Sequence, residues 1–227
     1  SQIFDQELLR VQGEYEPDWT GVWNAQDGLI PPNTFTYQDK TPIEVITTLA
    51  AAVGAFVHHD PVSRTLYVDK RYRANPWDFT QGIEDMALDH SSVISTGMAW
   101  KPTPEKNGVY VSGTTSDGYL CLIKRGGTDG QKALPMITDP LIVTPGIALE
   151  RGRYALNQAG KKGEYSIELP LLLNPEEGPV LHTPGKVLKM YPAPTWFGIV
   201  KAVSVGARVD NRAVVVRQQI TVERHFE

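Results

Sequence analysis

The sequence predicts an α+β protein, mainly antiparallel β, with barrel- or sandwich-like sheets and two helices. Residues 41–53 and 145–159 carry helical signals at both ends. The remaining apolar runs alternate like strands, and about eight to ten strands are expected. The 20 glycines and 17 prolines indicate many turns between short elements.

Residues 1–35 mix aromatic residues with turn formers, as in EYEPDWTGVWNAQDGLIPPNTF. We expect one or two short strands followed by a Pro-Pro connector. Because this segment has little apolar content, it is expected to complete an upstream or neighbouring domain. The sequence lacks an initiator Met, which suggests a fragment or a processed chain, and its first residues do not resemble a signal peptide.

The clearest predicted helix spans residues 41–53. Thr41 is a natural N-cap, Pro42 occupies the first helical position, and Glu44 completes a capping box. Gly54 is placed to end the helix. A turn containing HHDP and an alternating run, TLYVDKRY, follow, so residues 36–100 are expected to form a helix plus β-hairpin subdomain.

The second predicted helix, at residues 145–159, interrupts a series of strands. Thr144 caps it, Pro145 begins it and Gly160 ends it. Its packing face consists of small residues such as Gly152, which lets a helix lie close to a sheet. Residues 101–227 are therefore expected to form a β-barrel-like domain with one helix. The expected strands are VISTGMAW, GVYVSGT and YLCLIKRG before this helix, and EYSIELPLLL, GKVLKMY, WFGIVKAVSV and AVVVRQQITVERHF after it.

Composition excludes several classes of protein. The net charge of −4 and the scattered basic pairs argue against tight nucleic-acid binding. No apolar run reaches the ~18 residues of a membrane-spanning helix. The single cysteine, Cys121, lies in an apolar run and allows neither a disulfide framework nor a cysteine zinc site.

No local motif predicts a catalytic, metal or cofactor site. Adjacent histidines in HHDP would point to opposite faces of a strand, which is poor geometry for a metal pair. LDHSS contains triad residue types, but triads assemble through the fold and not from neighbours in sequence. An acidic group between Asp78 and Asp89, together with several tryptophans, leaves open an alternative: a carbohydrate-binding or cell-wall-degrading module.

The chain closes on a predicted hairpin at residues 196–226. Arg217, Gln219 and Glu223 alternate with apolar residues in its second arm, which predicts a half-buried strand with these three on a solvated face. Trp196 and Phe197 begin the first arm beside a proline-rich loop. These five residues are the candidate subunit or partner interface, and the alternative is that the two aromatic residues close the core.

Several segments together resemble tail hub proteins of bacteriophages. The stretch TPIEVITTLAAAVGAFVHHDPVSRTLYVDKRYRANPWDF resembles one part of these proteins, and NGVYVSGT with IKRGGTDG resembles their next strands. The broadest similarity runs from ALERGRYALNQAGKKGEYSIELPLL through TPGKVLKM to the closing hairpin, and extends to the hub portion of type VI secretion spikes. The resemblance covers roughly residues 40–227 and lies in the order and spacing of segments.

This resemblance implies a structural virion protein and not an enzyme. Hub proteins of this kind are typically homotrimers whose barrel domains join the tail tube to the tip or spike and form part of the conduit for DNA. The implied partners are the tube, distal tail, tape measure and tip or spike proteins, and no cofactor is implied. The implied location is the virion tail, assembled in the cytoplasm of a bacterial host; a secretion-system spike component is a further alternative.

Overall fold

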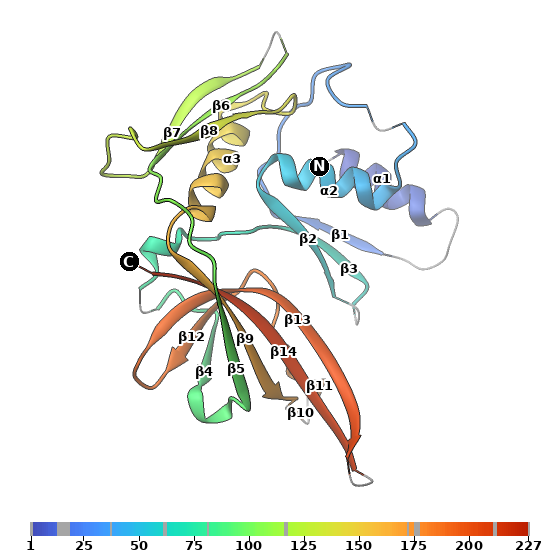
Figure 1. The fold of residues 1–227 in the computed structure, drawn as a ribbon. Coiled ribbons are helices and arrows are strands. Elements are labelled where there is room, and N and C mark those ends of the chain that lie inside the picture. Colours follow the sequence, from blue (N-terminus) through green and yellow to red (C-terminus); the bar gives the residue numbers. More distant parts are fainter. Residues whose placement is uncertain are drawn as a thin grey trace. The chain divides into compact units, whose positions relative to one another are not determined.

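The computed structural model shows three α-helices and mainly antiparallel sheets among the residues it describes, so the predicted α+β class is confirmed (Figure 1). The described residues are 2–12, 19–36, 38–60, 63–80, 82–115, 118–171, 173–174, 178–210 and 213–226. The chain divides into two compact units. Unit 1 contains Ser1–Arg71 and Glu105–Ala159, and unit 2 contains Tyr72–Pro104 and Gly160–Glu227. Each unit therefore combines two separated stretches of chain.

The first stretch of unit 1 forms a three-stranded sheet with two helices. Its elements are α1 (Gln2–Gln12), β1 (Thr20–Trp23), α2 (Pro42–Ala52), β2 (Ala55–Asp60) and β3 (Thr65–Lys70). The strand order is β1-β3-β2, with β1 parallel and β2 antiparallel to β3. Residues 1–35, expected to complete another domain, contribute α1 and β1 to this sheet and its helices.

Helix α2 begins and ends as its sequence predicts. The backbone N–H and the hydroxyl of Thr41 both donate to the Glu44 carboxylate at 2.8 Å. These bonds lower the pKa of Glu44. Gly54 follows the helix with φ +67°, and a Cβ there would lie 2.5 Å from the Cβ of Tyr154 on α3 (Pro145–Gln158). A glycine is needed both for the backbone conformation and for the close contact.

Helix α1 was not predicted, because residues 1–35 were expected to hold only strands. Its signal is the pair Phe4 and Leu8, spaced i and i+4 on one helical face. Phe4 is fully buried and its ring lies 5.6 Å from that of Trp23. Gly21 permits this packing, since a Cβ at this position would lie 2.4 Å from the Phe4 ring.

The second stretch of unit 1 is a three-stranded sheet covered by α3. Its strands are β6 (Gly108–Ser112), β7 (Leu120–Lys124) and β8 (Ala133–Thr138), in the order β7-β6-β8. Strand β8 was not predicted. It runs parallel to β6 at an edge of the sheet, where its Pro135 is tolerated because an edge strand leaves one row of N–H groups unpaired.

Small residues on α3 allow its close packing, as predicted. A Cβ at Gly152 would lie 2.6 Å from Ile123 on β7. The side chain of Thr144 caps the helix by accepting from the N–H of Ile147 at 3.3 Å. Two polar contacts join α3 to the first stretch: Lys70 to Glu150 at 2.9 Å, and Arg151 to the carbonyl of Ala51 at 3.0 Å.

Unit 2 is a six-stranded half-barrel in the order β4-β12-β13-β14-β9-β5 (Figure 1). Only the β4–β12 pair is parallel. The strands are β4 (Met86–Asp89), β5 (Ser95–Trp100), β9 (Lys162–Pro170), β12 (Val187–Tyr191), β13 (Trp196–Asp210) and β14 (Ala213–His225). Strand β4 is not among the strands expected from the sequence. The segment before it contains the short 3-10 helix Pro76–Asp78.

One face of this sheet carries the core of unit 2. The buried members include Ile167, Leu188, Val200, Ile220 and Val222, each at most 1% exposed. Their alternation along each strand is the half-buried pattern of an antiparallel sheet.

The predicted closing hairpin is present as β13 and β14. Their pairing begins with Ile199 opposite Glu223 and ends with Asp210 opposite Ala213. A β-bulge lies between Val200 and Ala202, so Lys201 is the extra residue on β13. This bulge is the reason why the first arm alternates less cleanly than the second. Gly198 allows β13 to approach β14 closely, since a Cβ there would lie 2.6 Å from the Val222 side chain.

Candidate functional site

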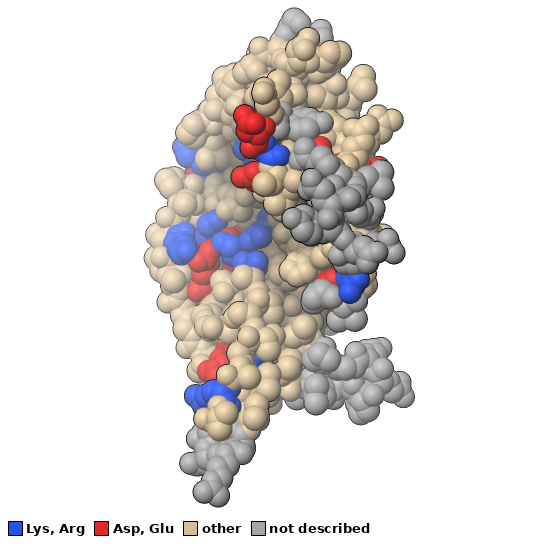
Figure 2. Space-filling model, turned by 90° about the vertical axis from the view of Figure 1, so that its right-hand side faces the viewer, with Lys and Arg blue, Asp and Glu red and all other residues tan. Residues whose placement is uncertain are grey.

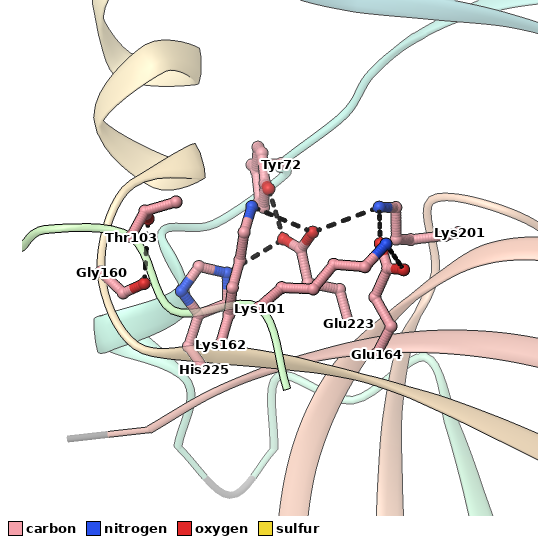
Figure 3. Close-up of polar contacts among 9 residues, drawn as sticks. All are labelled: Tyr72, Lys101, Thr103, Gly160, Lys162, Glu164, Lys201, Glu223 and His225. Atoms are coloured by element: carbon pink, nitrogen blue, oxygen red, sulfur yellow. Dashed lines mark hydrogen bonds and ion pairs between the residues drawn. The ribbon is translucent and has the colours of Figure 1, made fainter. Parts of the chain in front are cut away.

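A cluster of charged and polar side chains surrounds Glu223 near the base of the hairpin (Figure 3). Glu223 and Glu164 lie directly opposite each other on β14 and β9. The charge cluster, as we name it, consists of Tyr72, Lys101, Lys162, Glu164, Lys201, Glu223 and His225.

Glu223 is the centre of the charge cluster and is only 2% exposed. The Tyr72 hydroxyl donates to its Oε1 at 2.5 Å, and His225 Nε2 lies 3.0 Å from the same oxygen. Its Oε2 lies 3.5 Å from Lys162 Nζ and 3.6 Å from Lys201 Nζ. Both oxygens of the buried carboxylate are therefore compensated, as a buried charge requires.

The bulge in β13 supplies one of these cations. Ile199 pairs with Glu223, so Lys201, two residues further along β13, lies on the Glu223 side of the sheet. Its ammonium contacts both Glu164 and Glu223, and Lys101 also contacts Glu164. Lys201 thus bridges the two carboxylates, which would otherwise repel each other across the strands.

The charge cluster keeps its carboxylates ionised. Burial raises the pKa of Glu223, but hydrogen bonds from His225 and Tyr72 and the charges of Lys162 and His225 outweigh it and lower the pKa to about 2. Hydrogen bonds from Lys101 and Lys201 lower the pKa of Glu164. Carboxylates held in this state are poor proton donors or acceptors near neutral pH.

The charge cluster also joins the segments by which the chain enters and leaves unit 2. Tyr72 is the first residue of the unit, Lys101 precedes the exit at Pro104, and Lys162 follows the return at Gly160. Lys101 N–H donates to the carbonyl of Lys162 at 2.9 Å, and the N–H and hydroxyl of Thr103 donate to that of Gly160 at 3.1 and 3.0 Å. The arrangement fixes these segments and the end of β14 to the sheet.

The predicted interface residues fall into two groups. Trp196 is 7% exposed, with its ring 4.8 Å from Tyr165, which confirms the alternative that it closes the core. The prediction that Glu223 lies on a solvated face is wrong, because the charge cluster covers that end of the strand. Phe197 stays partly exposed, 6.0 Å from Lys189 Nζ.

Arg217 and Gln219 lie on the predicted outer face. Arg217 pairs with Glu168 at 3.4 Å, and Gln219 donates to the Ser166 hydroxyl at 2.7 Å. They border a shallow hollow of about 590 Å³ that crosses β13, β14, β9 and β5. Six members of the charge cluster were not among the predicted site residues, and no local sequence signal marks them: Tyr72, Lys101, Lys162, Glu164, Lys201 and His225.

The other chemical motifs of the sequence are occupied by structural contacts. His58 stacks between Phe56 and Tyr67, with ring centroids 5.1 Å apart in each pair, and its Nε2 lies 2.6 Å from Asp69 Oδ2. In the acidic segment, Glu84 pairs with Lys189, Asp85 with Arg73, and Asp89 caps the backbone of Ser91. No group of three or more potential metal ligands occurs among the described residues.

On the described part of the face in Figure 2, basic and acidic side chains lie in mixed groups separated by uncharged surface. Such a pattern offers no continuous basic surface for a phosphate backbone on this face. Among the described helices, none is long and apolar enough to cross a membrane.

Searches against protein-family models and curated proteins find no match to this sequence. Solved structures do match. The tail protein from Neisseria meningitidis MC58 superposes with a TM-score of 0.58 at 9% identity, over 98% of this chain and 66% of that one. The 43 kDa tail protein of prophage MuSo2 from Shewanella oneidensis superposes with a TM-score of 0.55 at 16% identity, over 98% of this chain and 65% of that one. A chain in the virion of a native gene transfer agent particle superposes with a TM-score of 0.47 at 13% identity, over 84% of this chain and 40% of that one.

These likenesses show that the chain shares the fold of two tail proteins, one of them from a prophage, over nearly its whole length. The chain spans about two thirds of the length of each of them.

Proposed function

We propose that this chain is a structural protein of a phage or prophage tail, located at the tail tip or baseplate hub. The observation that carries the proposal is the shared fold with two tail proteins over 98% of the chain. The order of segments that resembles tail hubs supports the same class. The charge cluster supports it chemically, because its contacts hold chain segments together and leave its carboxylates ionised.

In this proposal the protein acts by assembly. It forms a homotrimer that links the tail tube to the tip and contributes to the conduit for DNA, within a virion tail assembled in the host cytoplasm. Its partners are the tube, distal tail, tape measure and tip or spike proteins. Arg217, Gln219 and Phe197 are the partner-facing residues, since they remain at least partly exposed on unit 2.

Light scattering coupled to size-exclusion chromatography tests this proposal. We expect the chain to run as a trimer, alone or after addition of a distal tail or tube protein from the same phage or prophage. Arg217→Gln is expected to weaken binding to these partners, whereas Lys161→Gln removes the same charge from an exposed position outside the outer face and serves as the matched control. A chain that stays monomeric and binds none of these tail proteins would refute the proposal.

A further inference from the structure

The far end of the closing hairpin carries an exposed apolar stripe. Register pairs Val205 with Gln218, Ala207 with Val216, and Val209 with Val214, directly beyond the pair Val203–Ile220. Directly opposed residues share a face, so these side chains continue the face that carries the core residue Ile220. The distal stripe, as we name it, consists of Val205, Ala207, Val209, Val214 and Val216.

Neighbouring strands reach only the near end of the distal stripe, where the N–H of Leu171, directly after β9, donates to the carbonyl of Val216 at 3.4 Å. Strand β12 pairs with β13 only as far as Ile199, and β9 pairs with β14 only as far as Arg217. Figure 1 shows the two strands of the hairpin continuing past the others of the sheet. Val205, Val209 and Val214 are accordingly 50%, 76% and 69% exposed. An apolar two-stranded projection of this kind is marginal in water by itself and is a template for pairing.

The outer edge of β13 is also open. The backbone of Val200 still bonds to Gly185 and Lys186, but beyond it no described residue bonds to this edge of the strand. A row of backbone donors and acceptors therefore runs beside the distal stripe. A strand added to this edge would pair with these backbone groups and place its own side chains beside the distal stripe.

Strand β5, at the opposite edge of the same sheet, carries a second row of exposed side chains. Strand β5 pairs only with β9 among the described residues, and all six of its residues are exposed. Thr96 lies opposite Ile167 and Met98 opposite Tyr165, so the row continues the core face as the distal stripe does. Met98 is 51% exposed and Trp100 49%.

We infer that β5 of one copy pairs with the distal part of β13 of a second copy, so that Met98 and its neighbours contact the distal stripe. This inference rests on the proposed function and names the self-association surface. Both open edges and both apolar rows belong to every chain, and a head-to-tail contact places the two rows on one continuous face. A foreign partner on either edge would leave the other open. Such a heterologous contact forms a ring when its rotation closes.

Charge insertion tests the surface in the full chain. Val209→Lys and Met98→Lys each place an ammonium in the contact and are expected to weaken self-association by about tenfold or more, since an unpaired charge is costly in an apolar contact. Ser204→Lys adds the same charge to the other face of β13, also at an exposed position, and is the matched control. All three positions are exposed, so circular dichroism should show an unchanged fold.

Cysteine pairing tests the same contact independently. In a Cys121→Ser background, a Met98→Cys chain mixed with a Val205→Cys or Val209→Cys chain is expected to form a mixed disulfide dimer under mild oxidation. Efficient cross-linking of Val205→Cys chains with each other instead would indicate a symmetric hairpin contact and overturn the inference.

The outcomes separate the two proposals. An oligomer that survives both lysine substitutions, with no mixed disulfide, refutes this surface and leaves the proposed function standing. A chain that never self-associates but binds distal tail or tube protein also refutes only the surface. A monomer that binds no tail protein refutes both.

Discussion

Replacing Glu223 by Gln is expected to destabilise the protein by about 3 kcal/mol at pH 7. The carboxylate is 2% exposed, and its pKa falls from 4.5 to about 2 in the folded chain. Each tenfold change in an ionisation constant corresponds to about 1.4 kcal/mol, which gives this magnitude. Gln preserves the shape but loses the charge that His225, Lys162 and Lys201 compensate.

The pH dependence of this effect is specific. A carboxylate with a lowered folded pKa contributes stability that is fully present above its unfolded pKa, here 4.5, and is lost as the pH falls toward about 2. The difference in the free energy of unfolding between wild type and Glu223→Gln should therefore be largest above pH ~5.5 and should shrink steadily between pH ~5 and pH ~3. Carboxylates common to both proteins cancel in this difference.

Equilibrium urea unfolding followed by circular dichroism, at pH values from 7 down to 3, measures the effect. Glu168→Gln is the matched control. It removes a carboxylate on the adjoining strand β9, whose side chain is 34% exposed and pairs with Arg217. A loss of less than about 1 kcal/mol in the free energy of unfolding is expected. A Glu223→Gln variant that loses less than ~0.5 kcal/mol, or whose deficit is the same at pH 7 and pH 3, would refute the reasoning.

Four further substitutions test the packing. Trp196→Ala should lower the free energy of unfolding by about 3–5 kcal/mol, because the Trp196 side chain is buried. Phe197→Ala, at a partly exposed position, should lower it clearly less. Equal losses in the two variants would contradict the conclusion that Trp196 belongs to the core and Phe197 does not. Gly152→Leu should cost about 1–3 kcal/mol because its side chain meets Ile123, and an unchanged melting temperature would disprove that close contact. Gly54→Val should cost at least ~1 kcal/mol in the same assay from its positive φ and its contact with Tyr154, and a neutral result would argue against both.

Local signals explain which parts of the fold were predictable. Helix α2 follows from Thr41, Glu44 and Gly54, and its cap forms within a few residues of chain. Helix α1 carries an i, i+4 signal in Phe4 and Leu8, but the aromatic and turn-forming residues after it predict strands and turns for the same segment. Strand β8 contains Pro135, which argues against a strand unless the strand is known to lie at an edge.

The charge cluster could not be predicted because its members are far apart in the sequence. Tyr72, Lys101, Lys162, Lys201 and Glu223 meet only after the sheet is assembled. Alternation in β14 correctly groups Glu223 with Arg217 and Gln219 on one face. It does not show that the connecting segments cover one end of that face. Periodicity therefore assigns residues to faces, and only tertiary structure decides which part of a face is buried.

The bulge at Lys201 links the charge cluster to the distal stripe. On a regular strand, residues 202, 204, 206 and 208 would share the core face with Val200. The extra residue shifts the phase, so that Val203, opposite Ile220, returns to the core face and Val205 and Val209 follow it. The same shift places Lys201 against Glu164 and Glu223. One inserted residue thus compensates two carboxylates at the base of the hairpin and orients the apolar side chains at its far end toward the core face, which is the face that the proposed contact between copies requires.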